Sequence, residues 1–110
     1  GHQMSEFERK LAQLRADLNT QGARVSDQLL HAVESSFDGD TEAATKVVQS
    51  DGIIDRVDVE IERACIDLLR LGPNDEHGIR SVLTIVKVNN ELERIQSFET
   101  DWFSFEWFFC

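Results

Sequence analysis

The chain has 110 residues, of which 41% are hydrophobic and 29% charged, and this suits one globular domain rather than a disordered segment. Its formal net charge of −10 argues against nucleic acid as a partner, because the phosphate backbone is also negative. No apolar run is long enough to span a membrane, and two cysteines are too few for the disulfide framework of a secreted domain. We therefore expect a cytoplasmic protein that meets a membrane only indirectly.

The first predicted helix runs from about Ser5 to Ser36, because apolar residues recur there at spacings of three, four or seven. Ser5 is placed to cap its start, and Glu8, three residues later, completes the pattern of a capping box. Residues 1–4 are set apart from the domain, because the residues before Met4 resemble a remnant of cloning. The apolar stripe of this helix consists of Phe7, Leu11, Leu14, Leu18, Val25, Leu29 and Val33.

The second predicted helix follows the turn sequence FDGDTE and ends at about Leu71. Asp40 or Thr41 can cap its start, because either side chain can accept a hydrogen bond from a free backbone N–H. The helix stops before Gly72-Pro73, because proline cannot continue the hydrogen-bond ladder. Its apolar stripe consists of Val47, Ile54, Val57, Ile61, Cys65 and Leu68.

The third predicted helix follows that break, with Asn74 or Asp75 as its cap. Short connections between helices make neighbouring helices run antiparallel. The predicted fold is therefore all-α, an up-down-up antiparallel three-helix bundle that forms one domain over residues 5–98. The apolar stripe of the third helix consists of Ile79, Val82, Leu83, Val86, Leu92 and Ile95.

Residues 99–110 are predicted to form a separate aromatic tail that contains the sequence DWFSFEWFFC. Aromatic side chains bury large areas and dominate interfaces, so this segment needs a surface to cover it. Three roles remain open: packing on its own bundle or on a second copy, docking to a protein partner, and attachment to a membrane surface. We favour the first, and the acids Glu99, Asp101 and Glu106 weaken the third.

Acidic and amide side chains form a second pattern along the last two helices. Asp51 and Asp55 begin a narrow acidic stripe, continued by Asp58 and Glu62, that borders the apolar stripe of the second helix. In an antiparallel pair, these two acids should stand close to Glu93 on the third helix. Carboxylate oxygens suit divalent or iron ions, so Asp51, Asp55 and Glu93 are the candidate metal ligands, with Asn89 and Asn90 as possible support. The alternative is a solvated acidic face, with asparagines that bridge the helix interface.

Two segments carry a resemblance to a known family: VVQSDGIIDRVDVEIERACIDLL, and GIRSVLTIVKVNNELERI after the Gly-Pro break. Together with FERKLAQLRADL near the start, they make the chain similar to the PhoU family of bacterial phosphate-uptake regulators, over roughly Phe7 to Ile95. The resemblance implies a three-helix unit, of which typical members carry two in tandem. It also implies contact with the ATPase of a phosphate ABC transporter and with a sensor histidine kinase.

The same resemblance implies a place for metal ions, because some family members bind metal clusters through E/D-xxx-D motifs on the second and third helices. Asp51 and Asp55 match the first motif in full, and Glu93 matches the opening acid of the second. The closing acid of the second motif falls at Ser97, and the family's glycine falls at Gln96. One carboxylate ligand is therefore missing, and we expect weaker or differently shaped coordination.

The sequence therefore predicts a PhoU-like regulatory domain in phosphate transport and phosphate-starvation signalling, which acts by protein contact and not as an enzyme. Because the chain holds one three-helix unit, we expect a homodimer that restores the interface between units. Two alternatives remain: a metal-binding helical bundle and a purely structural oligomerisation module. A carboxylate-bundle enzyme is disfavoured, because the paired Glu-xx-His ligands of di-iron bundles are absent.

Overall fold

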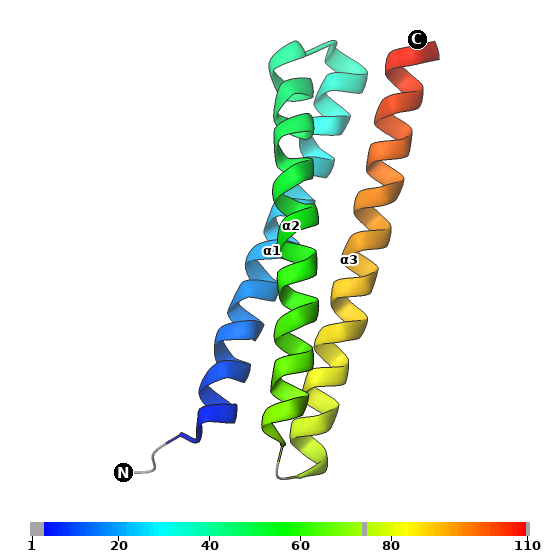
Figure 1. Cartoon of the computed structure of the whole chain (residues 1–110). Helices are drawn as coiled ribbons and strands as arrows, with labels where there is room; N and C mark the ends of the chain where they lie inside the picture. Colours follow the sequence, from blue (N-terminus) through cyan, green and yellow to red (C-terminus); the bar gives the residue numbers. More distant parts are fainter. Residues whose placement is uncertain (1–3, 74, 110) are drawn as a thin grey trace.

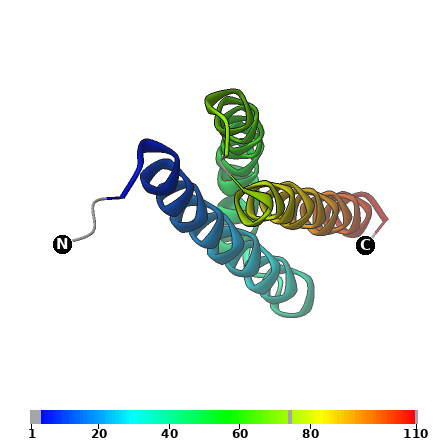
Figure 2. The ribbon, with the colours of Figure 1, turned by 90° about the horizontal axis from the view of Figure 1, so that it is seen from below.

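The computed structural model describes residues 4–73 and 75–109, with side chains described as far as residue 103. This part of the chain contains three helices and no strand: α1 (Glu6–Asp38), α2 (Thr41–Leu71) and α3 (Glu76–Phe109). The helices run up, down and up, so α1 and α3 are parallel to each other and antiparallel to α2 (Figure 1). The end-on view shows them at the corners of a triangle (Figure 2). The predicted all-α three-helix bundle is confirmed, as a rod of 56 × 25 × 18 Å.

Local hydrogen bonds fix the helix boundaries, as the sequence predicted. The Ser5 side chain accepts the N–H of Glu8 at 3.1 Å, and Asp40 accepts the N–H groups of Glu42 and Ala43. Asp75 accepts the N–H of Gly78 at 2.8 Å at the start of α3; Asn74, the other predicted cap, lies outside the described residues. These caps satisfy N–H groups that the first turn of a helix leaves without partners.

Both connections between helices begin at a glycine whose backbone is in the left-handed region. Gly39 has φ 64° and closes α1 with a hydrogen bond to the carbonyl of Ser35, while Gly72 has φ 93° and closes α2 with a bond to Leu68. A side chain is strained at positive φ, which explains why glycine stands at both turns. The short turns return each helix directly along its neighbour.

The apolar core is concentrated towards the two ends of the rod. One cluster lies near the loop that joins α2 to α3, and it consists of Leu14, Ile61, Cys65, Leu68, Val82 and Ile85. Cys65 is a buried free thiol, as predicted, and burial raises its pKa. A second cluster lies near the loop that joins α1 to α2, and it consists of Ala32, Ala44, Val47 and Phe103. Polar side chains occupy several of the core positions between them.

Five residues that we assigned to the apolar stripes are instead largely exposed. Leu29 and Val33 in α1 are each 45% exposed, and Ile79, Leu83 and Ile95 in α3 are 43 to 47% exposed. The buried line of α1 continues from Val25 through Gln28 and Ala32, at alternating steps of three and four. Helices that pack at a shallow angle bury this seven-residue pattern, including its polar members, so the apolar side chains beside the line remain on the surface.

The aromatic segment continues α3 without a break, because the helix extends to Phe109. Our boundary between residues 98 and 99 therefore falls inside a helix, and whether it divides functional regions stays a prediction. Phe103 is 9% exposed and packs against α1 and α2, as expected of a segment that covers its own bundle, whereas Trp102 is 47% exposed. No helix of the described residues is both long and apolar enough to cross a membrane.

Candidate functional site

Amide side chains of α1 and α3 donate hydrogen bonds to main-chain carbonyls of α2. From α1, Gln21 donates to the carbonyl of Ile54 at 2.8 Å, and Gln28 donates to the carbonyl of Val47 at 3.2 Å and to the hydroxyl of Ser50 at 3.1 Å. Both glutamines are 1% exposed. The donors are seven residues apart on α1 and the acceptors seven residues apart on α2, so the two bonds repeat every two turns.

The same arrangement recurs between α3 and α2, with carboxylates as additional acceptors. Asn89 donates to the carbonyl of Asp58 at 3.3 Å and to its carboxylate at 2.6 Å. Seven residues later, Gln96 donates to the carbonyl of Asp51 at 3.4 Å, to the carboxylate of Asp51 at 2.7 Å and to that of Asp55 at 2.8 Å. One amide nitrogen thus lies between two carboxylates from successive turns of α2.

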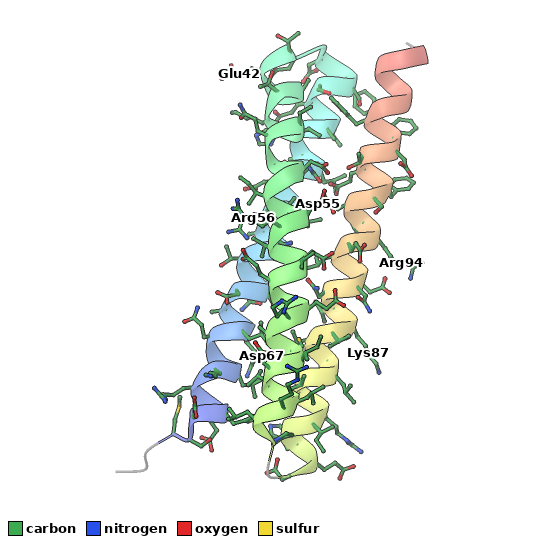
Figure 3. All side chains as sticks on the ribbon, in the orientation of Figure 1. Glu42, Asp55, Arg56, Asp67, Lys87 and Arg94 are labelled. Atoms are coloured by element: carbon green, nitrogen blue, oxygen red, sulfur yellow. The ribbon has the colours of Figure 1, made fainter. Side chains whose placement is uncertain are left out.

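We call Asp51, Asp55, Gln96 and Thr100 the acid–amide site. Thr100 completes it by donating its hydroxyl to the Asp51 carboxylate at 3.1 Å. Asp55 lies on the side of α2 that faces α3, whereas Lys87 and Arg94 of α3 point away from the bundle (Figure 3). The donors to these two carboxylates are therefore neutral groups from α3, and the site carries a net negative charge at neutral pH.

Asp58 lies beside the acid–amide site, and burial together with the negative charge of that site raises the pKa of its carboxyl group. Burial is the main cause that raises the pKa of Asp58, and the charges of Glu62 and Asp55 raise it further. The hydrogen bond from Asn89 acts in the opposite direction, because it stabilises the ionised form. The interface between α2 and α3 therefore holds several acids at close range with hydrogen-bond donors and no basic side chain bonded to them among the described contacts.

The predicted site residues divide into two groups in the structure. Asp51 and Asp55 face α3, and Asn89 is 4% exposed and bonded to α2. Glu93 and Asn90 are exposed, and the residue of α3 that contacts both Asp51 and Asp55, where we expected Glu93, is Gln96. Sequence reasoning missed Gln96 and Thr100 as site residues. The signal that could have found Gln96 is its seven-residue spacing from Asn89, which places both amides on one line of α3.

The described side chains do not form a preassembled metal centre. Within the part of the chain that the structure describes, no three His, Cys, Asp or Glu side chains come together as a set that could hold an ion. An amide N–H donor also occupies the space between the Asp51 and Asp55 carboxylates, where a cation would need an acceptor. Gln96 thus does with a neutral group what a cation would do: it offers positive partial charge to both acids.

Comparison with known proteins shows the family of this three-helix unit. The PhoU domain model matches residues 18–97, which is most of the chain and includes all of α2 and parts of α1 and α3. The chain belongs to the PhoU domain family. The PhoU resemblance seen in the sequence is therefore confirmed, and the match includes Asp51, Asp55 and Gln96 of the acid–amide site.

Curated PhoU proteins are similar over most of this chain. The chain is 30% identical over 94 residues to the phosphate-specific transport system accessory protein PhoU of Serratia marcescens, covering 86% of this chain and 39% of that protein. It is 37% identical over 89 residues to PhoU homolog 1 of Thermotoga maritima, covering 81% of this chain and 38% of that protein. For the Escherichia coli K12 protein, identity is 29% with coverage of 86% and 39%. No solved structure gave a significant match.

These relatives bear on the function at a coarse level. They are named accessory proteins of phosphate-specific transport, and this agrees with our expectation of a regulator and not an enzyme. The chain spans about two fifths of the length of the PhoU proteins that it matches. The partners and activity of a whole PhoU protein are therefore proposals for this chain.

Proposed function

We propose that this PhoU domain is a regulatory unit of phosphate transport and phosphate-starvation signalling, and that it acts in the cytoplasm by protein contact. The observation that carries the proposal is the PhoU match over residues 18–97, together with relatives named for phosphate-specific transport. The exposed apolar side chains support a role in contact, since the outer faces of all three helices carry them. The proposed partners are the ATPase of a phosphate ABC transporter and a sensor histidine kinase.

A bacterial host that lacks its own PhoU protein provides the test. The chain is expressed there with an affinity tag, and copurification of the transporter ATPase and of the histidine kinase is measured under phosphate-rich and phosphate-starved conditions. We expect at least one of the two to copurify, and a phosphate-starvation reporter to fall when the chain is present. If neither protein copurifies under either condition and the reporter is unchanged, the proposal is wrong.

We also propose that the domain forms a homodimer. Large apolar residues are exposed near the loop that joins α2 to α3, namely Ile66 and Leu69 on α2 and Ile79 and Leu83 on α3, each 43 to 47% exposed. Water-exposed apolar side chains grouped at one end of a bundle favour burial against a second copy. A structural module that only oligomerises would share this dimer, but it would leave the phosphate-starvation reporter unchanged.

The alternative is a metal-binding bundle with Asp51, Asp55 and Glu93 as ligands. The observation in its favour is that the Asp51 and Asp55 carboxylates both lie within hydrogen-bond distance of one atom, the Gln96 amide nitrogen. Binding of a divalent or iron ion would require Gln96 to withdraw this nitrogen and Glu93 to turn inward from its exposed position. Elemental analysis after growth with added metals tests it: an ion content close to zero removes the alternative.

A further inference from the structure

Glu99 is a buried acid that has no hydrogen-bond partner among the described residues. It lies on α3, three residues after Gln96, on the line of core positions that continues to Phe103. The residue is 2% exposed, and neither of its carboxylate oxygens has a hydrogen-bond partner. An ionised carboxylate in such a place is costly unless a cation or several donors approach it. Glu99 is not part of the acid–amide site.

A surface depression of about 250 Å³ lies beside Glu99. Its walls come from the last part of α1 and the last part of α3, which run side by side and in the same direction (Figure 1). Among the residues whose side chains the structure describes, those that line it besides Glu99 are apolar or aromatic: Leu29, Ala32, Val33, Phe98 and Trp102. Glu99 is therefore the acidic residue of an otherwise apolar lining, and its two carboxylate oxygens are buried in the free domain.

The rim of this depression is shaped for a helix. Leu29 and Val33 are 45% exposed and lie one turn apart on α1, and Phe98 and Trp102 are 69% and 47% exposed and lie one turn apart on α3. Two such ridges enclose the kind of groove that a third helix fills with its apolar face. A small free amine would leave these four side chains in water.

Charge complementarity identifies what that helix must carry. The described ion pairs of the chain are all exposed pairs within single helices, so none brings a cation to Glu99. A Lys or Arg side chain has an apolar stem that suits the walls and a charged end that suits the carboxylate. Aromatic rings such as Phe98 and Trp102 also attract cations at their faces.

We propose that this depression is a docking site for a basic amphipathic helix of a protein partner, which inserts one Lys or Arg side chain against Glu99 while its apolar residues cover the rim. The inference rests on the proposed function only in that both assume regulation by protein contact. It adds the chemistry of the partner and the surface that receives it.

A displayed library of helical peptides provides the test. The library is selected on the wild-type chain in the presence of an excess of untagged Glu99→Gln protein, so that only peptides that read the carboxylate are retained. We expect enrichment of one Lys or Arg flanked by Leu, Phe or Trp. A synthetic peptide from the selection should bind Glu99→Gln about thirtyfold more weakly or worse, the scale typical for loss of one partner of a buried charge pair. Replacing its basic residue with Met should weaken binding to the wild-type chain similarly.

Matched variants keep this test decisive. Val33→Gln should also lose the peptide, while Val48→Gln, on the exposed face of α2, should retain it; circular dichroism and thermal unfolding check that each variant is folded. The inference is wrong if no peptide is enriched, if the enriched peptides lack a basic residue, or if Glu99→Gln binds them equally. It is also wrong if a second copy occupies the depression, which light scattering would reveal as a dimer that Val33→Gln dissociates.

The outcome is separable from that of the proposed function. Failure of the peptide selection with intact copurification of a phosphate-transport partner removes this docking site and leaves the regulatory role. Successful selection without copurification removes the regulatory proposal and leaves a site for a basic helix.

Discussion

Single side chains fix the register of this bundle. Gln21 and Gln28 from α1, and Asn89 and Gln96 from α3, each donate to a main-chain carbonyl of α2. A carbonyl offers two lone pairs, so it can accept such a bond while it keeps its bond within the helix. A shift of α1 or α3 by one turn along α2 would leave buried amide groups without hydrogen-bond partners. Each unsatisfied group would cost about 1–3 kcal/mol. The amides thus select one alignment, which apolar contacts alone would leave less defined.

Gln96→Glu tests whether this amide replaces a cation at the acid–amide site. The change removes the shared donor and adds a third carboxylate beside Asp51 and Asp55, so we expect the free energy of unfolding to fall by about 2–4 kcal/mol. Urea unfolding in the presence of a chelator measures this. Added Mg²⁺ or Mn²⁺ should restore part of the stability of the variant and leave the wild-type chain unchanged.

Ser97→Glu is the matched control for that variant. Ser97 is exposed on the next position of α3, so the same charge there should change stability by no more than about 0.5 kcal/mol. An equal loss in both variants would mean that only net charge matters. A Gln96→Glu variant as stable as the wild-type chain would contradict the bridging role of the amide.

Because Glu99 is buried, we expect the free energy of unfolding to decline with rising pH. Burial raises its pKa from the ordinary value of 4.5 to about 7. Between these values the folded chain keeps a proton that the unfolded chain has released, so the contribution of Glu99 is complete below pH 4.5 and is lost as the pH rises through about 7. At about 1.4 kcal/mol per pKa unit, the loss relative to Glu99→Gln amounts to at most about 3.5 kcal/mol.

Unfolding of the two proteins at intervals from about pH 5 to about pH 8 checks this sign and size. The wild-type chain should lose stability relative to Glu99→Gln across that range. Glu93→Gln is the control for the removal of one carboxyl group, because Glu93 is an exposed acid of the same helix. A difference between wild type and Glu99→Gln that does not vary with pH would contradict the prediction.

Different contacts hold the two halves of α3. The first half of α3 contributes Val82 and Ile85 to the larger apolar cluster. In its second half, Gln96 and Glu99 occupy core positions, and Phe103 is the residue of that stretch that joins the smaller cluster. Among the side chains that the structure describes, the second half of α3 is therefore held by Phe103 and by the acid–amide site, whereas its start is held by contiguous apolar packing.

Phe103→Ala should release the end of α3 without unfolding the bundle. Removing a buried phenylalanine costs about 3–5 kcal/mol, and the local contacts around residues 96–103 share that loss. Hydrogen exchange should accelerate for the amides of this stretch and remain slow near Val82. Phe98→Ala, at a position that is 69% exposed, should leave both regions protected; uniform acceleration along α3 in Phe103→Ala would contradict this.

On the scale of the whole molecule, the bundle is a rod with apolar clusters towards its ends and polar core positions between them. Its surface is acidic overall, with a net charge of −10, yet exposed apolar residues are found on each helix. Charge keeps such a surface soluble and favours basic partners, while the apolar residues supply the area that contacts need. The two proposed contacts lie at opposite ends: a second copy near the α2–α3 loop and a basic helix beside Glu99.

Leu83→Glu and Ile66→Glu test the proposed homodimer. A charge at the centre of an apolar interface is costly to desolvate, so each variant should be a monomer where the wild-type chain is a dimer. Sedimentation or light scattering measures the mass. Val48→Glu, near the other end of α2 and 64% exposed, should remain a dimer. A wild-type chain that is monomeric at high concentration would contradict the homodimer.

The sequence by itself determined the elements of this protein. Three helices, their caps at Ser5, Asp40 and Asp75, and the glycine turns follow from residues a few positions apart, because capping bonds and helix periodicity are local. The sequence also showed the similarity of the segments around Asp55 and Glu93 to PhoU proteins, and the domain match confirms the family.

Only the tertiary structure decided which side chains meet. The sequence placed Asp51 and Asp55 opposite the second half of α3, but it could not separate Glu93, which is exposed, from Gln96, which bonds to both acids. It likewise assigned Leu29 and Val33 to the core in place of Gln28 and Ala32. Neighbouring positions on a helix differ by about 100°, and the rotation that chooses between them comes from packing against two other helices at once.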